Sequence, residues 1–302
     1  MINANNIKYQ VLELLHENKS TRLYKCEKNN KEFIIKAYRK NFINRWQREI
    51  NVFNDIKDYT NIIRCVGWCA NVKIYSNIYH LIILEHAKYG DLFEFLTNNK
   101  GFIKKETIIS IFSQILNGVK ALHSKNWYHR DLKLENIVIS NLNPIRVKII
   151  DFEFSTQEKS SNTCIGTISY MSPQMLLNFD YDNRKNDIWT LGVLFFCMYT
   201  GVRPYSDPSP KKNSKNNFNC NWLEAIREKN WVSFWLSVEK SIKNINNELL
   251  DKNNSFPSDF KNMMESMLAW NEKDRSNLNS LINHNFIKQS EEINKCCTCN
   301  LF

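Results

Sequence analysis

The order of apolar and polar residues divides the chain into a strand-rich first part and a helix-rich second part. Short alternating runs in residues 7–40 predict antiparallel hairpins. Apolar residues at helical spacing in 41–57 predict one helix, and residues 62–86 return to strands. Two further short strands, N-I-V-I and V-K-I-I, interrupt the second part. Its helices are predicted near residues 91–98, 106–125, 186–200, 221–242, 257–270 and 277–288.

This division predicts two packed lobes of an α+β protein, because a β-rich segment followed by a helical one forms separate layers. We place a small β-rich lobe with one key helix at residues 1–86 and a larger, mainly helical lobe at 87–290. Residues 291–302 form a cysteine-rich tail.

Composition excludes several classes of protein. With 302 residues and 43% apolar content, the chain can bury a sizeable core and is neither a disulfide-stapled miniprotein nor a disordered chain. No apolar run reaches the ~18–20 residues of a membrane span, and we expect no secretory leader. Nine irregularly spaced cysteines favour a reducing compartment and a cytoplasmic protein. The net charge of +10 comes without a basic stripe interleaved with aromatics, so no nucleic-acid partner is expected.

The strongest chemical signal is the run H-R-D-L-K-L-E-N at 129–136, followed fifteen residues later by Asp151-Phe152-Glu153. Either motif alone is compatible with an ordinary polar loop. Together, between two short strands, they resemble the protein kinases, and the resemblance covers roughly residues 7–290. It is closest to the calcium/calmodulin-dependent and AGC-like serine/threonine groups. The resemblance implies the bilobal protein kinase fold and a monomer.

The resemblance also implies roles for four polar residues in a reaction that uses ATP and Mg²⁺. Asp131 would accept or orient the proton of the substrate hydroxyl. Asn136 and Asp151 would hold Mg²⁺, a hard cation that prefers carboxylate and amide oxygens. Lys133 would neutralise charge on the transferred phosphoryl group, and a lysine two residues after Asp131 is typical of serine/threonine kinases. The implied activity is transfer of the γ-phosphoryl group of ATP to Ser/Thr hydroxyls of protein substrates.

Nucleotide binding is implied for residues in both lobes. Lys36 would contact the α and β phosphates, and Glu49 on the following helix would pair with it. Leu84 would be the gatekeeper before the hinge, and Asp91 fits either a ribose contact or a helix N-cap. The residues that would meet adenine and ribose are Leu15, Leu23, Ile34, Leu84, Glu85, Ala87, Asp91 and Val138.

The phosphate-binding loop departs from the family, because His16, Asn18 and Thr21 stand where three glycines are usual. Glycine permits close approach of the backbone to phosphates. Because this loop lacks glycine, we expect weaker binding of ATP. The alternative function is therefore a pseudokinase that binds or scaffolds with weak or no phosphoryl transfer.

Three further residues are expected to affect the turns around the site. Two of them differ from the usual family residue, and the third is a buried aspartate. Glu153 replaces a glycine and would stiffen the turn close to the metal. Gln174 replaces a glutamate and should pair with Arg275 through a weaker, singly charged hydrogen bond. Asp187, at the start of D-I-W-T-L-G, should brace the backbone of the 129–130 turn.

Regulation and substrate choice are also suggested by the resemblance. Thr163 is a candidate phosphosite, with Arg45 and Arg130 as ligands of its phosphate; the alternative is a solvated loop residue. Asp91 and Glu135 would favour substrates with upstream basic residues, although Cys197 stands where a third acid is common.

The C-terminus resembles a C-a-a-X prenylation signal, with Cys299 fourth from a terminal Phe. Cys296 and Cys297 could add palmitoyl chains, since stable anchoring takes two signals. The protein would then work at the cytosolic face of a membrane. An ordinary unmodified tail is the alternative.

Overall fold

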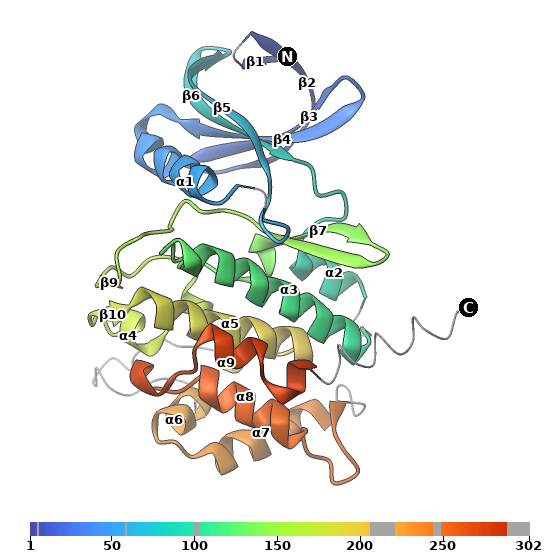
Figure 1. The fold of residues 1–302 in the computed structure, drawn as a ribbon, viewed down its shortest axis with the longest axis vertical. Coiled ribbons are helices and arrows are strands. Elements are labelled where there is room, and N and C mark those ends of the chain that lie inside the picture. The colour runs from blue at the N-terminus through green and yellow to red at the C-terminus, as the bar shows by residue number, and fades with distance from the viewer. Residues whose placement is uncertain (5, 58, 100–102, 206–220, 244–248, 289–302) are drawn as a thin grey trace.

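The computed structural model describes residues 1–288 except positions 5, 58, 100–102, 206–220 and 244–248. Two lobes stack along the long axis of the molecule, with the strands of the first part above the helices of the second (Figure 1). The predicted bilobal α+β architecture is therefore confirmed. The predicted tail at 291–302 lies outside the described residues.

The small lobe is an antiparallel sheet of six strands in the order β1-β2-β3-β4-β6-β5. Helix α1 (Ile43–Asp55) packs on it through the stripe Trp46, Ile50 and Phe53, which the periodicity predicted. Strand β1 lies before the predicted hairpins and buries Ile2 and Ala4 against the sheet. The strands are β1 (Ile2–Ala4), β2 (Ile7–Glu17), β3 (Thr21–Lys28), β4 (Lys31–Arg39), β5 (Cys65–Ile74) and β6 (Asn77–Glu85).

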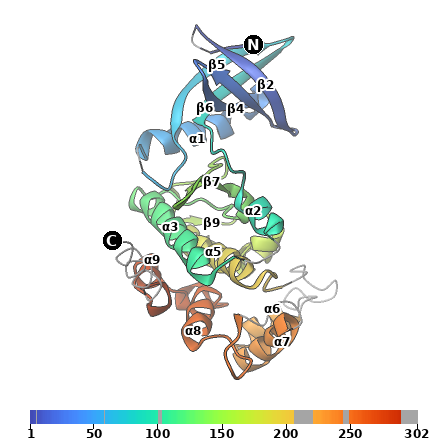
Figure 2. The ribbon, with the colours of Figure 1, turned by 90° about the vertical axis from the view of Figure 1, so that its right-hand side faces the viewer.

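The large lobe is built around α5, in which almost every residue is buried (Figure 2). Two short antiparallel pairs of strands, the hairpin β7–β8 and the more widely separated β9 and β10, complete it. Its elements are α2 (Leu92–Asn98), α3 (Lys105–Ser124), β7 (Ile137–Leu142), β8 (Ile145–Ile149), β9 (Ser160–Ser161), α4 (Pro173–Leu176), β10 (Tyr181–Asp182), α5 (Asn183–Thr200), α6 (Asn221–Arg227), α7 (Trp231–Lys243), α8 (Ser258–Met267) and α9 (Leu278–Ile282).

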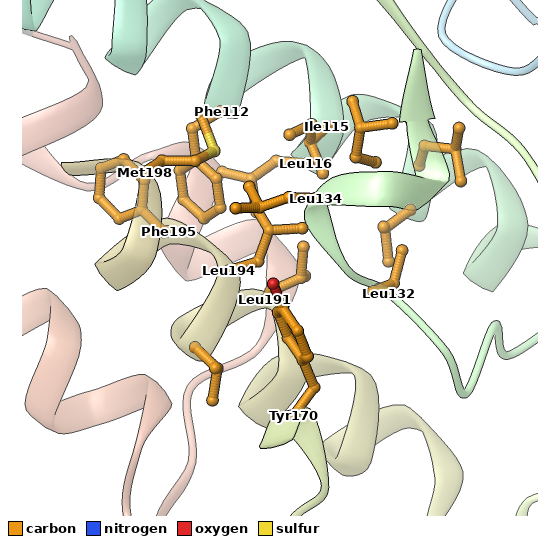
Figure 3. Packing of buried hydrophobic residues seen from close by; sticks show 14 of the residues in the cluster. Phe112, Ile115, Leu116, Leu132, Leu134, Tyr170, Leu191, Leu194, Phe195 and Met198 are labelled. Atoms are coloured by element: carbon orange, nitrogen blue, oxygen red, sulfur yellow. The ribbon is translucent and has the colours of Figure 1, made fainter. Parts of the chain in front are cut away.

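The core of this lobe supports the loop that carries the candidate catalytic residues. Phe112 of α3 stacks on Phe195 of α5 with ring centroids 3.9 Å apart. Leu132 and Leu134, which flank Lys133, are buried in the same cluster (Figure 3). The apolar members of the H-R-D-L-K-L-E-N run thus fix the loop to the core, and its polar members remain available for chemistry.

The prediction of one helix over 221–242 is wrong, because the chain forms α6 and α7 with a break between them. Lys229 takes a left-handed backbone conformation (φ 57°). The backbone N–H of Asn230 bonds to Ala225 O at 2.8 Å, and its side chain accepts from Ser233 N at 3.1 Å. Asn230 caps α7, and this cap breaks the helix although the apolar pattern continues across the break. The helix predicted at 277–288 is interrupted, since α9 ends at Ile282 and residues 285–288 form a separate helical turn.

No helix in the ranges that the structure describes is long and apolar enough to cross a membrane.

Candidate active site

A chain of charges joins the two lobes at the site. Lys36 Nζ on β4 lies 3.0 Å from Glu49 Oε2 on α1 and 2.8 Å from Asp151 Oδ1 after β8. Glu49 is fully buried, and Tyr38 donates a 2.5 Å hydrogen bond to the same oxygen. The predicted Lys36–Glu49 pair is therefore present, and Asp151 joins it.

Two members of this group, Lys36 and Asp151, have pKa values shifted in the direction that keeps them charged. Burial alone would lower the pKa of Lys36, but the carboxylates of Asp151 and Glu49 raise it well above its ordinary value. Burial would likewise raise the pKa of Asp151, yet the Lys36 ammonium holds it below the usual range. Asp151 therefore presents a charged carboxylate, which is the ligand a divalent cation requires.

Asp131 is held by donors on both of its carboxylate oxygens. Its Oδ1 accepts from the backbone N–H and the hydroxyl of Thr167, both at 2.9 Å. Its Oδ2 lies 3.2 Å from Lys133 Nζ and 3.2 Å from Asn136 Nδ2. Lys133 also donates to the Thr167 hydroxyl at 2.9 Å. The four residues form one network that fixes the orientation of the carboxylate.

Gly166 permits this approach of Thr167 to the catalytic loop. Its φ is +97°, and a Cβ there would lie 2.8 Å from Arg130 O and 3.1 Å from Asp131 Oδ1. Only glycine fits this position, because a side chain would be both strained and in contact with backbone. The bond from Thr167 to Asp131 was not predicted; the only sequence signal for it is the Gly-Thr pair that follows the candidate phosphosite.

The donor set at the site fits a magnesium ion. Asp151 supplies carboxylate oxygens, and Asn136 donates through Nδ2 to Asp131 O at 2.7 Å, which leaves its amide oxygen as the atom for a cation. One carboxylate and one amide match the preference of Mg²⁺ for few protein ligands, with phosphates completing the shell.

The turn before Asp131 is braced from α5, as the sequence predicts. Asp187 is fully buried and accepts from the backbone N–H groups of His129 and Arg130, both at 2.9 Å. His123 Nε2 lies 2.9 Å from the same carboxylate. These bonds hold Arg130 in a left-handed conformation (φ 69°) that a non-glycine residue adopts only when its surroundings impose it.

A family model described as the protein kinase domain matches residues 9–287. This chain belongs to the protein kinase family. It is 35% identical over 173 residues to the serine/threonine-protein kinase SAPK9 of Oryza sativa subsp. japonica, which covers 55% of this chain and 45% of the relative. It is 37% identical over 138 residues to the serine/threonine-protein kinase SRK2E of Arabidopsis thaliana, covering 44% and 37%.

The chain thus spans less than half the length of these two kinases. Among solved structures, Rad53 residues 1–466 in complex with AMP-PNP has the same fold, with a TM-score of 0.69 and 22% identity. The match covers 92% of this chain and 65% of that one. The assignment to a calcium/calmodulin-dependent or AGC-like group stays a prediction.

The segment predicted to be the hinge follows β6. Leu84, the predicted gatekeeper, is buried and pairs with Ile34 in the β4–β6 register. Ile34, Ala87 and Val138 are partly buried and pack against the extended core cluster that contains Leu84. The Glu85 side chain accepts from Lys148 Nζ at 2.7 Å and from Arg64 N at 2.8 Å, which ties the hinge to both lobes.

The other residues predicted to bind the nucleotide differ in their hydrogen bonding and in their exposure to solvent. Asp91 caps α2, accepting from Glu94 N at 2.8 Å, so the N-cap interpretation is confirmed and the ribose contact stays a prediction. Leu23 is partly buried on β3, and Leu15 on β2 is 43% exposed.

The glycine-poor hairpin between β2 and β3 closes on itself through Asn18. Asn18 Oδ1 accepts from the backbone N–H groups of Ser20 and Thr21, both at 2.8 Å. His16 pairs with Leu23 in the strand register. None of residues 7–28, all of which the structure describes, has a positive φ. The loop therefore does not need glycine to adopt its backbone conformation. The residues that replace the family glycines instead limit how closely the backbone can approach phosphates.

Arg275 pairs with Gln174, as the sequence predicts. Its Nη2 donates to Gln174 Oε1 at 2.5 Å, and its Nε donates to Ala269 O at 2.9 Å. Arg275 is only 3% exposed, and burial lowers its pKa to about 9. Gln174 also donates to Trp270 O at 2.7 Å, a bond that a glutamate could not make. The amide thus satisfies two neighbours where a carboxylate would satisfy one.

The candidate phosphosite Thr163 lies against Arg130. Arg130 Nη2 donates to the Thr163 hydroxyl and, at 3.0 Å, to Tyr181 OH, which in turn donates to Thr163 O at 2.8 Å. Tyr181 was not predicted at this position. Arg45, the second ligand predicted for a phosphate on Thr163, pairs with Glu153 in this structure, with Nη1 3.1 Å from Glu153 Oε1; its contact with a phosphate stays a prediction. The Glu153 carboxylate is therefore paired with α1.

Proposed function

We propose that the chain transfers the γ-phosphoryl group of ATP to Ser/Thr hydroxyls of protein substrates, using Mg²⁺. The observation that carries this proposal is the network in which Lys133, Asn136 and Thr167 orient the Asp131 carboxylate. The charged chain of Lys36, Glu49 and Asp151 supports it, because it holds the proposed phosphate ligand Lys36 2.8 Å from the proposed metal ligand Asp151. The relatives, which are named serine/threonine-protein kinases, support the choice of acceptor.

In the proposed reaction Asp131 orients the acceptor hydroxyl and takes its proton as the new O–P bond forms. The bond between the γ-phosphorus and the oxygen that bridges it to the β-phosphate breaks, and ADP leaves with that oxygen. Lys133 Nζ, already 2.9 Å from the Thr167 hydroxyl, would offset charge on the phosphoryl group. Bound Mg²⁺ would neutralise phosphate charge, and Asp151 and Asn136 would hold it.

An array of Ser, Thr and Tyr peptides incubated with Mg²⁺ and ATP tests this function. The proposal predicts phosphate on Ser and Thr peptides and none on Tyr peptides. Nucleotide binding, measured by a thermal shift with ATP, combined with no transfer to any peptide would instead favour the pseudokinase. No residue of the catalytic network favours that alternative; only the glycine-poor loop does.

Phosphorylation of Thr163 is proposed to raise activity. Its hydroxyl already contacts Arg130, whose charge can pair with a phosphate there. We expect Thr163→Ala to lower kcat about 3–10-fold, the effect of losing one charge-assisted contact of about 1 kcal/mol or slightly more. Peptide kinetics on the variant and on Asn162→Ala, an exposed neighbour, measure this. Equal kcat for Thr163→Ala and the unchanged protein would contradict the proposal.

Preference for upstream basic residues is proposed to rest on Glu135. Glu135 is exposed, whereas Asp91 is engaged in capping α2 and Cys197 is buried. We expect Glu135→Ala to weaken selection of upstream Arg about 5-fold, because a surface ion pair contributes up to about 1 kcal/mol. Matched peptides with Arg or Gln upstream give the ratio of kcat/KM. A ratio that is near one already in the unchanged protein would exclude this substrate class.

Lipidation of the tail is proposed from sequence alone, since Cys296, Cys297 and Cys299 lie outside the described residues. A prenyl chain on Cys299 and palmitoyl chains on its neighbours would place the kinase at the cytosolic face of a membrane. We expect Cys299→Ser to move the protein from the membrane fraction to the supernatant of lysed cells. A wholly soluble unchanged protein, or membrane association that survives the substitution, would reject the anchor.

A further inference from the structure

Three side chains of α1 hold the turn that follows Asp151, the proposed metal ligand. Arg45, Arg48 and Glu49 share one face of the helix, because they are spaced three and four residues apart. Arg48 Nη1 donates to Glu153 O at 2.7 Å, and Glu49 Oε1 accepts from Phe152 N at 3.4 Å. Arg45 completes the set through the Glu153 side chain at 3.1 Å.

The Arg45–Glu153 ion pair is shielded from solvent and is flanked by two aromatic rings. The Glu153 side chain is only 12% exposed and that of Arg45 35% exposed, so the pair is shielded from water more than a surface ion pair is. The Arg45 guanidinium lies 5.3 Å from the centre of the Phe42 ring and 5.0 Å from that of Phe154. These two rings orient it toward Glu153 and add cation–π attraction.

The backbone at this turn does not require the glycine that the family usually has at position 153. The left-handed torsion falls on Asp151 (φ 67°), and Glu153 is not among the positive-φ residues. A glutamate is therefore accommodated without strain there, and its side chain is free to serve another purpose.

We infer that Glu153 is a positioning residue, an acidic latch that holds α1 against the 151–153 turn and so keeps Glu49 within reach of Lys36. The carboxylate occupies Arg45, the α1 arginine that would otherwise be available to a phosphate on Thr163. The Lys36–Glu49 pair then forms before any phosphorylation, and a phosphate on Thr163 acts through Arg130 alone. This inference rests on the proposed function for its kinetic consequence, but its structural consequence is independent of catalysis.

The latch predicts that restoring the family glycine lowers activity. Glu153→Gln and Glu153→Gly should each lower kcat about 10-fold with the peptide KM unchanged, because α1 would leave its catalytic position in a larger fraction of molecules. Arg45→Ala should have the same effect, and the double variant Glu153→Gln/Arg45→Ala should be no worse than the stronger single one. Arg45→Lys, which keeps the charge, should retain part of the activity.

Hydrogen exchange of α1 tests the same latch without relying on transfer. The amides of residues 43–55 should exchange faster in Glu153→Gln and Arg45→Ala than in the unchanged protein. Glu239→Gln is the matched control, since Glu239 is 11% exposed and pairs with Lys261 at 2.6 Å in the other lobe. It should leave both α1 exchange and kcat as they are.

The outcomes separate the two claims. Unchanged α1 exchange in Glu153→Gln, or additive losses in the double variant, would overturn the latch whatever the activity. Activity in Glu153→Gly equal to or above that of the unchanged protein would also overturn it. If no variant, including the unchanged protein, transfers phosphate but α1 exchange responds to Glu153, the latch stands and the proposed function fails.

Discussion

Replacing Asp131 with Asn should lower kcat for peptide phosphorylation about 10²–10⁴-fold, the range expected for loss of a positioned general base. The carboxylate has donors on both oxygens, from Thr167 on one side and from Lys133 and Asn136 on the other. An amide would set its NH₂ group against one of these donors and could not take the proton of the acceptor hydroxyl.

Steady-state kinetics with Mg²⁺-ATP and a Ser peptide measure this effect. The KM for ATP should change little, because the Lys36, Glu49 and Asp151 chain is left intact. Asp259→Asn on α8 is the control for loss of an acidic group in the same lobe, and its kcat should equal that of the unchanged protein. A decrease of less than about fivefold in Asp131→Asn would mean that another group orients the hydroxyl.

Replacing Arg275 with Ala should lower the free energy of unfolding by about 3–5 kcal/mol, because it removes a buried side chain and leaves several partly buried acceptors without this donor. The guanidinium donates to Gln174 Oε1, Ala269 O and Lys185 O and lies 5.0 Å from the centre of the Trp189 ring. It therefore joins three segments of the large lobe and fills space against α5.

Urea denaturation followed by tryptophan fluorescence gives this change in free energy. Gln174→Ala is the matched comparison. It removes one acceptor of the guanidinium and should cost only about 1–2 kcal/mol. Loss of less than about 1 kcal/mol in Arg275→Ala would show that the large lobe does not depend on this arginine.

The parts of the site that the sequence predicts are those set by short motifs at fixed spacing. Asp187 reaches the 129–130 turn because a buried carboxylate at that helix start needs donors, and backbone N–H groups of a tight turn supply them. The stripe of α1 follows from helical periodicity. Both depend on local geometry, which residue order encodes directly.

The parts that the sequence does not predict are long-range choices between equivalent partners. Arg45 had two possible anionic partners, Glu153 and a phosphate at Thr163, and in the structure it pairs with Glu153 while the rings of Phe42 and Phe154 pack beside its guanidinium. Arg45 and Glu153 are separated by 108 positions, so a local sequence pattern around either residue does not predict their contact. The break at Lys229 is missed for a different reason, since helical periodicity on both sides hides a single left-handed residue.

Strand β1 shows the same limit at the N-terminus. Its three residues alternate apolar and polar, but so short a run does not by itself predict a strand. The burial of Ile2 and Ala4 depends on pairing with β2 and on the neighbouring β5, which a local pattern of three residues cannot reveal.

The most direct test of the central claim is transfer of radiolabelled γ-phosphate from Mg²⁺-ATP by the purified chain, with the Asp131→Asn variant as background. We expect label on Ser or Thr residues of the chain itself or of an added protein substrate, dependent on Mg²⁺ and at least a hundredfold above the variant. Equal label in the two preparations, or label only on tyrosine, would contradict it.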